Sequence, residues 1–271
     1  MLADMGREVL TAGAILAALA IGASAMADDI AAAKKALAPT GSLRVGVVSA
    51  PKADVFFVAT DADGKVRGVI VDIGNALART LAVSTELVIA HNSGELTDGL
   101  EKGLIDVAFL PVDDERRKRV DFGPAYVEFE STCLVLGTSE FRKVGDLDRP
   151  GVRVGGEANT TTIRAAARLL KVATVVPIRS VDEAITMLRS GQIDAFALGR
   201  DALVPYQREI PGSRLLDGYF HRTGIAVAVP KNRPAALAHV RTFIEGAKAG
   251  GLIRRIFDDA GLQATAVAGE K

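Results

Sequence analysis

The chain is poor in the residues that build disulfide scaffolds and metal centres. Its 271 residues include one cysteine, no tryptophan and three histidines, and the histidines are scattered without the spacing of a metal site. One cysteine cannot form an internal disulfide, and Cys133 lies in a strand-like run, where its simplest role is that of a small buried apolar residue. We therefore expect no metal ion and no cofactor.

The chain also lacks an excess of charge of either sign. It has 33 basic and 33 acidic side chains, whereas nucleic-acid-binding and membrane-surface proteins need a surplus of basic residues. After the first residues, no run is apolar enough to span a membrane. We expect a monomer that binds a small molecule and does not bind nucleic acid.

The N-terminus has the features of an export signal. An apolar, alanine-rich run over 9–23 is followed by Ala25-Met26-Ala27, which fits the small-x-small pattern of a cleavage site. We expect residues 1–27 to be a cleaved signal peptide, with an uncleaved N-terminal anchor as the alternative, and translation from either Met1 or Met5. No cysteine follows the cleavage site, so the expected location is the periplasm, without a lipid anchor.

What the chain does contain is one phrase written twice. Leu100-Glu-Lys-Gly103-Leu-Ile105-Asp106 returns as Leu188-Arg-Ser-Gly191-Gln-Ile193-Asp194. Each copy predicts the last turn of a helix, a glycine that ends it and a buried strand that begins at Ile-Asp. Two copies indicate two lobes that are built alike. Because ligands of open α/β sheets bind outside the carboxyl ends of the strands, we expect a functional cleft between the lobes.

Strand-like and helical segments alternate along the chain. Strands are predicted at 43–48, 85–90, 105–110, 126–136, 152–155, 172–178, 193–198 and 223–229, and helices at 69–81, 161–170, 233–248 and 252–260. Asn92 and Ser180, each with a glutamate three residues later, predict helix N-caps. The order predicts an α/β fold with mainly parallel strands, and the tail from Gln263 is expected to be disordered.

Five stretches carry a likeness to a known family. They are Leu43-Arg-Val-Gly-Val, Gly68-Val-Ile-Val-Asp72-Ile, Ile105-Asp-Val-Ala-Phe, Asp114-Glu-Arg116-Arg-Lys-Arg-Val-Asp121-Phe122-Gly-Pro-Ala-Tyr126 and Gly224-Ile-Ala-Val-Ala-Val. Over roughly 41–262 the chain resembles the family 3 extracellular solute-binding proteins of polar amino acid ABC transporters. The resemblance implies a two-lobed periplasmic-binding-protein fold, each lobe a mainly parallel sheet flanked by helices. The first lobe would take 41–130 and 224–271, the second 131–222, with a two-strand hinge between them.

The resemblance assigns one arginine a role in binding. In the family, the arginine that follows Asp-Glu in this loop binds the α-carboxylate of the ligand, and Arg116 occupies the matching position. A guanidinium group can bind a carboxylate through two parallel hydrogen bonds. The alternative is that Arg116 belongs to an exposed basic stretch over 116–119 and contacts no ligand.

The chain departs from the family around the expected site. The threonines that usually precede the arginine are missing between Asp106 and Arg116. Ser93 replaces an aromatic side chain, and Gly199 stands where the family has an acid for the ligand's α-ammonium group. A buried ammonium without an anionic partner is costly. We therefore predict that carboxylates without an α-amine bind at least as well as matching amino acids, unless Glu157 supplies a displaced acid.

The other predicted binding residues are polar side chains near the starts of helices. Asn159-Thr160-Thr161 opens a helix whose free amides favour an anionic group, or it serves as a cap alone. Arg200 is expected either to bind a second anion or to form an ion pair nearby, and Asp201 is expected to cap the next helix. The predicted ligand-binding set is Arg116, Asn92, Ser93, Asn159, Thr160, Thr161 and Arg200.

These features together predict the periplasmic substrate-binding component of an ABC importer. We expect it to capture a small carboxylate-bearing solute, an amino acid or a related organic acid, by closing two lobes about a hinge, and to deliver it to permease subunits. The alternative is a periplasmic enzyme of the cyclohexadienyl dehydratase type, since such enzymes share the fold. Their Gly-Gly-Thr-Asn-Glu segment is scrambled here as Gly155-Gly-Glu-Ala-Asn159, so we expect no enzymatic activity.

Overall fold

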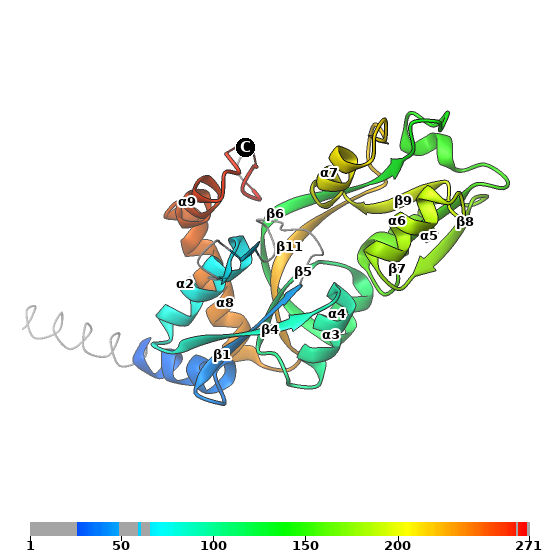
Figure 1. The fold of residues 1–271 in the computed structure, drawn as a ribbon. Coiled ribbons are helices and arrows are strands. Elements are labelled where there is room, and N and C mark those ends of the chain that lie inside the picture. Colours follow the sequence, from blue (N-terminus) through cyan, green and yellow to red (C-terminus); the bar gives the residue numbers. More distant parts are fainter. Residues whose placement is uncertain (1–25, 49–58, 61–65, 264, 270–271) are drawn as a thin grey trace, which may run out of the picture.

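The computed structural model describes residues 26–48, 59–60, 66–263 and 265–269 (Figure 1). The expected signal peptide therefore lies outside the described residues, except for Met26 and Ala27, which belong to a helix that is described over 26–37. In the described part of the chain, no helix is both long enough and apolar enough to cross a membrane.

One mixed sheet of nine strands has the order β4-β1-β5-β11-β6-β9-β7-β8, with β10 paired to β6. At one end β1 is parallel to β4 and β5, and at the other end β7 is parallel to β8 and β9. The antiparallel strands β6 and β11 join these two groups, which confirms the predicted parallel halves and their two-strand connection (Figure 1). The strands are β1 (Ser42–Val48), β4 (Ser84–Ala90), β5 (Val107–Pro111), β6 (Val120–Val135), β7 (Arg153–Glu157), β8 (Thr174–Ile178), β9 (Ala195–Gly199), β10 (Arg214–Leu215) and β11 (His221–Pro230), with a separate pair β2 (Ala59–Thr60) and β3 (Val66–Arg67).

Helices cover both faces of each half of the sheet. Buried side chains of α2, α8 and α9 belong to one core cluster of the first half, and those of α3 belong to another. In the second half, α5 packs into one cluster, and α6 and α7 pack into the other. The helices are α2 (Val69–Thr80), α3 (Ser93–Glu101), α4 (Asp114–Arg119), α5 (Thr161–Leu169), α6 (Val181–Arg189), α7 (Arg200–Glu209), α8 (Pro234–Ala249) and α9 (Leu252–Asp259), with a 3-10 turn η1 (Val144–Leu147).

Each half of the molecule buries its own hydrophobic core. The two clusters of the first half contain buried residues only from before 130 or after 224. The two clusters of the second half contain buried residues only from 133–216. Cys133 is fully buried in the second half, as predicted, and this burial raises the pKa of its thiol. The molecule therefore has two lobes, each held together by its own apolar side chains.

The repeated phrase adopts the same conformation in both lobes. Gly103 follows α3 and Gly191 follows α6, with φ angles of 68° and 70°. The amide of the next residue donates to the carbonyl five residues earlier, at 2.9 Å in the first lobe and 2.8 Å in the second. Glycine adopts this left-handed backbone without the strain that a side chain would cause. The two predicted helix ends are confirmed.

The duplication extends to an ion pair at the amino ends of the strands. The Asp106 carboxylate accepts hydrogen bonds from the backbone amide, Nε and Nη2 of Arg44, at 3.0, 2.9 and 2.7 Å. The Asp194 carboxylate accepts the same three bonds from Arg153, at 2.8, 3.1 and 3.0 Å. Such paired, charge-assisted bonds fix geometry as well as contributing energy. Each lobe thus has its first strand tied to the start of its central strand.

The C-terminal tail differs from the expectation of disorder. Val267 is buried and forms an isolated antiparallel bridge with Val127, and the Ala268 amide donates to the Tyr126 carbonyl at 2.9 Å. The prediction is therefore wrong for 265–269. Local composition indicated no structure there, but backbone groups of β6 bind the tail and the core of the first lobe buries its valine.

Candidate functional site

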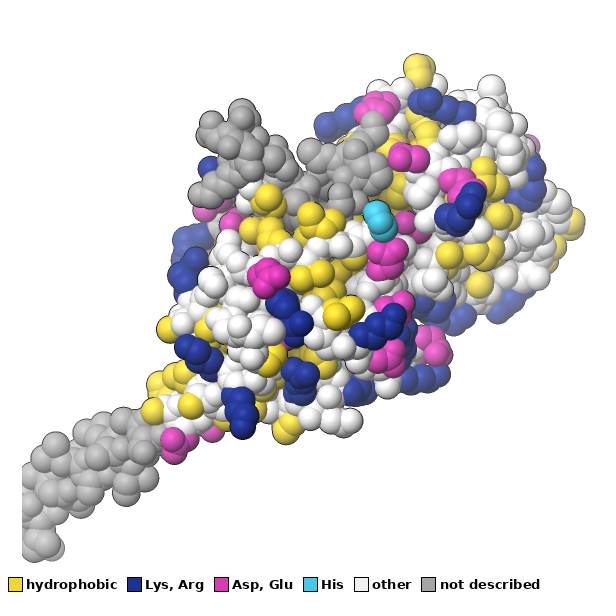
Figure 2. All heavy atoms as spheres, turned by 60° about the horizontal axis from the view of Figure 1, so that its bottom comes forward, with side chains coloured by type: hydrophobic (Ala, Val, Ile, Leu, Met, Phe, Trp, Pro, Cys, Tyr) yellow, Lys and Arg dark blue, Asp and Glu magenta, His cyan; other side chains and the backbone are white. Residues whose placement is uncertain are grey.

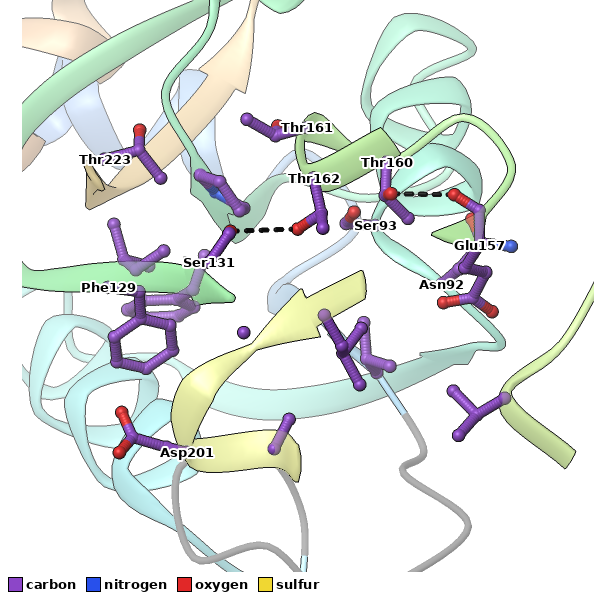
Figure 3. A pocket seen from close by; sticks show the side chains of 18 of the residues that line it. Asn92, Ser93, Phe129, Ser131, Glu157, Thr160, Thr161, Thr162, Asp201 and Thr223 are labelled. Carbon is purple, nitrogen blue, oxygen red and sulfur yellow. Dashed lines mark hydrogen bonds between the residues drawn. The ribbon is translucent and has the colours of Figure 1, made fainter. Parts of the chain in front are cut away.

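A cavity lies between the lobes at the carboxyl ends of the parallel strands (Figure 3). The last residues of β1, β5, β7 and β9 all line it, namely Val48, Pro111, Glu157 and Gly199. His91, which directly follows β4, lines it as well. Parallel strands place their carboxyl ends along one edge, and here the edges of both lobes face the same space. The predicted cleft is thus where the strand order places it.

Much of the cavity wall is apolar and aromatic. Phe109 and Tyr126 meet edge to face, with ring centroids 5.8 Å apart and an interplanar angle of 86°. Phe129 and Tyr206 line other parts of the wall. A pocket of this composition removes the body of a ligand from water, and the few polar groups then decide its orientation.

A row of hydroxyl groups forms a second wall (Figure 3). The Thr160 hydroxyl caps α5 by accepting from the Ile163 amide at 3.3 Å, as expected for a helix start. Thr162 and Ser131 lie 3.2 Å apart, oxygen to oxygen. These side chains can donate or accept, so they can bind either end of a polar ligand.

Glu157 is the buried acid of the cavity. Its residue is 8% exposed, and its carboxylate has no hydrogen-bond partner among the described residues; Thr160 donates instead to its backbone carbonyl at 2.7 Å. Burial raises the pKa of Glu157 to about 7, and the nearby charge of Glu95 adds to the effect. At neutral pH this carboxyl is therefore close to half protonated.

Asp201 faces Glu157 across the cavity (Figure 3). The sequence favours a capping role for this acid, but the N-cap of α7 is Gly199 without a side-chain bond, so that interpretation is wrong. Burial raises the pKa of Asp201, with Arg200 acting against the shift and Glu130 adding to it. The helix begins early enough for Asp201 to lie in its first turn and to line the cavity.

Arg116 is buried directly behind the cavity wall. Its Nη2 donates to Ser93 Oγ at 2.7 Å, and its Nη1 donates to Thr161 Oγ1 at 2.6 Å and to the Pro111 carbonyl at 3.0 Å. All three partners line the cavity, but Arg116 itself is 2% exposed and does not line it. Burial lowers the pKa of Arg116 to about 10, although Asp113 opposes the shift. The guanidinium is therefore charged at neutral pH.

Asp113, Arg116, Thr161 and Arg164 form an interlobe network. Asp113 Oδ2 accepts from Thr161 Oγ1 at 2.6 Å and from the guanidinium of Arg164, so a residue after β5 binds two residues of α5. Burial alone would raise the pKa of Asp113, but hydrogen bonds from Thr161, the Arg116 amide and Arg164 lower it to about 2. The two lobes are thus joined by a charged, buried contact beside the cavity.

The lobes also touch where α3 begins. A Cβ atom added to Gly94 would lie 2.8 Å from the Cβ of Asn159, which has a φ angle of 61°. Asn92 caps α3 as predicted, because its Oδ1 accepts from the Gly94 amide at 2.8 Å and from the Glu95 amide at 3.0 Å. Only glycine, which has no side chain, permits this close approach of the two segments.

The structure brings four of the seven predicted binding residues to the cavity. Asn92, Ser93, Thr160 and Thr161 line it. Three do not: Arg116 lies behind the wall, Asn159 packs against α3, and Arg200 binds Glu130, with Nε and Oε2 3.4 Å apart. Lining residues outside the predicted set include Phe109, Tyr126, Phe129, Ser131, Thr162, Asp201 and Thr223. Phe109 ends the quoted stretch Ile105-Asp-Val-Ala-Phe, and Thr162 directly follows Asn159-Thr160-Thr161, so both lay within or next to segments that the sequence singles out.

The surface outside the cavity is mixed in charge. On the face shown in Figure 2, lysine and arginine side chains are interspersed with aspartate and glutamate. Lys118 and Glu115 form an exposed ion pair at 2.7 Å, and Arg119 binds Asp98 at the same distance. Because these charges balance one another, the two acids of the cavity do not reflect a generally acidic surface.

A family comparison identifies the chain's relatives. The model of the bacterial extracellular solute-binding proteins, family 3, matches residues 45–261. The glutamine-binding protein of Geobacillus stearothermophilus is 26% identical over 195 residues, which cover 70% of this chain and 73% of the relative. The L-arginine-binding protein of Pseudomonas aeruginosa is 28% identical over 212 residues, covering 72% and 80%.

Solved structures show the same architecture. An ancestral arginine-binding protein bound to glutamine superposes with a TM-score of 0.69 at 26% identity, covering 82% of this chain and 98% of that one. An ancestral amino acid-binding protein, described as a precursor of cyclohexadienyl dehydratase, gives 0.68 at 26% identity, covering 82% and 96%. A mutant of the arginine-binding protein of T. maritima gives 0.71 at 23% identity, covering 85% and 99%, which shows the fold alone.

Proposed function

Because the chain belongs to the bacterial extracellular solute-binding proteins, family 3, we propose that it is the periplasmic component of an ABC importer that captures an amino acid or a related small solute. The observation that carries this proposal is the cavity between the lobes, to which β1, β5, β7 and β9 each contribute their last residue. The names of the relatives, which bind glutamine and arginine, support an amino acid or a close analogue.

The proposed mechanism is closure of two lobes about β6 and β11. We assign 41–130 and 224–271 to the first lobe and 131–222 to the second, and the separate core clusters support these boundaries. Closing would bring the strand ends of both lobes onto the solute, and the closed form would be the one that the permease recognises. The protein would act as a monomer that loads an ABC permease.

Arg116 is the proposed partner of a carboxylate on the solute. Its guanidinium already donates to the hydroxyls of Ser93 and Thr161, both of which line the cavity. A carboxylate entering at this wall could replace these neutral acceptors, and charge-assisted bonds are about twice as strong as neutral ones. The exposed-stretch alternative loses support because Arg116 is buried whereas Arg117 and Lys118 are exposed.

A binding screen with a matched variant tests whether Arg116 binds a carboxylate of the solute. Calorimetry with amino acids and their deaminated analogues should find a ligand, and Arg116→Ala should weaken its binding at least about tenfold, as expected for loss of a charged hydrogen bond. Lys118→Ala is the matched control, because Lys118 is exposed and pairs only within its own helix. Arg119 is less suitable because it binds α3. Equal affinity of Arg116→Ala and the wild type would show that Arg116 does not bind the carboxylate.

Export is the second part of the proposal. A leader ending at Ala27 would place the mature protein in the periplasm, and the description of its family as extracellular solute-binding proteins supports export. N-terminal sequencing of protein recovered from the periplasm should begin at or near Asp28. Full-length protein recovered from the cytosol would contradict the assignment.

The enzymatic alternative makes a different prediction about the solute. A dehydratase releases a chemically altered product, whereas a binding protein returns its ligand unchanged. Glu157, with its pKa near 7, is the group that could act as a general acid on this fold. Mass spectrometry of solute recovered after prolonged incubation should find it intact; conversion that is lost in Glu157→Gln would establish the enzyme.

A further inference from the structure

Glu157 differs from the other buried acids that the structure describes. Asp106 and Asp113 are buried too, but each carboxylate accepts several hydrogen bonds from arginine, threonine or backbone amides. Glu157 is as buried as Asp113, within a percentage point, and its carboxylate accepts none from a described residue. A buried polar group without a partner costs stability. Because Glu157 lines the cavity, a group that enters the cavity can supply the missing partner.

The cavity supplies no cation for this carboxylate. Its lining residues in the described part of the chain include no lysine or arginine, and its other acid, Asp201, lies on the opposite side (Figure 3). Arg116, the nearest candidate in the sequence analysis, donates to Ser93, Thr161 and Pro111 instead. A positive charge that arrives with the solute would complement Glu157.

Gly199 explains why the acid is found on a different strand. The family carries its ammonium-binding acid at the matching position, at the end of β9, and here a Cβ atom would meet nothing within 4 Å. The space that the usual acid would fill is therefore open. Glu157 ends β7, which pairs directly with β9, so its carboxylate lies one strand away from Gly199 along the same edge.

We propose that Glu157 binds a cationic nitrogen of the solute, in place of the missing acid at Gly199, and that the solute therefore carries an ammonium or guanidinium group. This inference rests on the proposed function, since it concerns the same cavity, and it reverses the sequence expectation that carboxylates without an amine bind equally well. The aromatic wall of Phe109, Tyr126 and Phe129 supports it, because cations are stabilised over aromatic faces. Asp201 adds a second anionic group at the other side.

The first test uses ligands that differ by one charge. Arginine, citrulline and δ-guanidinovalerate share a carbon skeleton, but citrulline has a neutral side chain and δ-guanidinovalerate lacks the α-ammonium group. With glutamate and glutarate they form a panel for calorimetry against the wild type and Glu157→Gln. We expect removal of the cationic group that Glu157 binds to weaken binding to the wild type at least about tenfold, and Glu157→Gln to remove most of that difference.

The second test restores the acid where the family carries it. Gly199 has a φ angle of −58°, which any residue can adopt, and it occupies the N-cap position of α7, where aspartate is favourable. Adding Gly199→Asp to Glu157→Gln should recover at least about tenfold of the lost affinity for the cationic probe. A merely structural loss in Glu157→Gln would not be repaired by an acid on another strand.

The third test measures how many protons are released when the solute binds. A cation beside Glu157 favours its charged form, so binding near pH 7 should release a fraction of a proton from the wild type and none from Glu157→Gln. Calorimetry in two buffers of different ionisation enthalpy measures this. The nearby charge that acts on Glu157 is that of Glu95 from α3, and the other titratable residues that line the cavity include His91 and Asp201. His91→Gln and Asp201→Asn should both retain the release.

The outcomes separate this inference from the proposed function. If a ligand binds in an Arg116-dependent way and Glu157→Gln binds every probe as the wild type does, the inference is wrong while the proposed function stands. Preference for glutarate over glutamate would also overturn it, because glutarate carries no cationic nitrogen. If no member of the panel binds at all, the proposed function fails and takes the inference with it.

Discussion

Replacing Glu157 by glutamine should stabilise the ligand-free protein. Glu157 is 8% exposed, and the pKa of its carboxyl is raised to about 7 from an ordinary value of 4.5. Because the folded state holds this proton more tightly than the unfolded state, the contribution of Glu157 to stability is fully present below about pH 4.5 and is lost as the pH rises through 7. At about 1.36 kcal/mol for each pH unit of difference, the charged form costs the folded state roughly 3 kcal/mol above pH 7.

The neutral amide of Glu157→Gln avoids that cost. The variant should match the wild type near pH 4.5 and exceed it by up to about 3 kcal/mol at pH 8, which corresponds to roughly 6–12 °C in melting temperature for a protein of this size. Urea unfolding and thermal scans without ligand, at both pH values, measure the difference. Glu95→Gln is the control and should give a smaller gain, because it removes only the neighbouring charge.

A variant that is no more stable than the wild type at pH 8 would refute this reasoning. It would mean that the Glu157 carboxylate is solvated or paired in the ligand-free protein, and the argument for a cationic solute would lose its starting point. A gain of equal size at both pH values would also refute it, since the gain would then come from packing and not from charge. The expected signature is therefore the pH dependence itself.

Three further predictions concern the contact between the lobes. Arg164→Ala should separate the lobes and increase the radius of gyration in solution scattering at neutral pH, whereas Arg168→Ala, exposed on the same helix, should not. Since the pKa of Asp113 is lowered to about 2, its stabilisation should be complete above about pH 4 and lost as the pH falls towards 2, and scattering across this range would show no change if the acid were unpaired. Gly94→Ala should weaken solute binding, because its Cβ would lie 2.8 Å from that of Asn159; unchanged affinity and an unchanged radius of gyration would contradict the close approach.

Local patterns predicted the lobes because the determinants lie close together in sequence. A glycine that ends a helix and the buried strand that follows it occupy ten residues, so the repeated phrase could be read directly and its two φ angles of 68° and 70° agree with it. The caps at Asn92 and Ser180 are equally local, since each side chain accepts from an amide three residues later. The resemblance of five short stretches to known sequences predicted the family, and the family model matches residues 45–261.

The site was harder to predict because its contacts join distant segments. Arg116 donates to Thr161 across 45 residues of sequence. Nothing in the sequence of 116–119 indicates that Arg116 is buried while Arg117 and Lys118 are exposed. Glu157 could be recognised only as a possible displaced acid, since its exposure and its missing partner depend on how β7 faces the other lobe. Asp201 was assigned to capping because the start of α7 could not be fixed to one residue.

The Arg44–Asp106 and Arg153–Asp194 pairs have a consequence for how this protein could change its ligand. Both pairs lie at the amino ends of their strands, whereas the cavity is built at the carboxyl ends. Each lobe therefore keeps its alignment at one end while residues at the other end are free to vary. Residues at the carboxyl ends, such as Glu157 of β7 and Gly199 of β9, can therefore be exchanged without disturbing either ion pair. Selectivity can change at the cavity while the alignment of each lobe is kept.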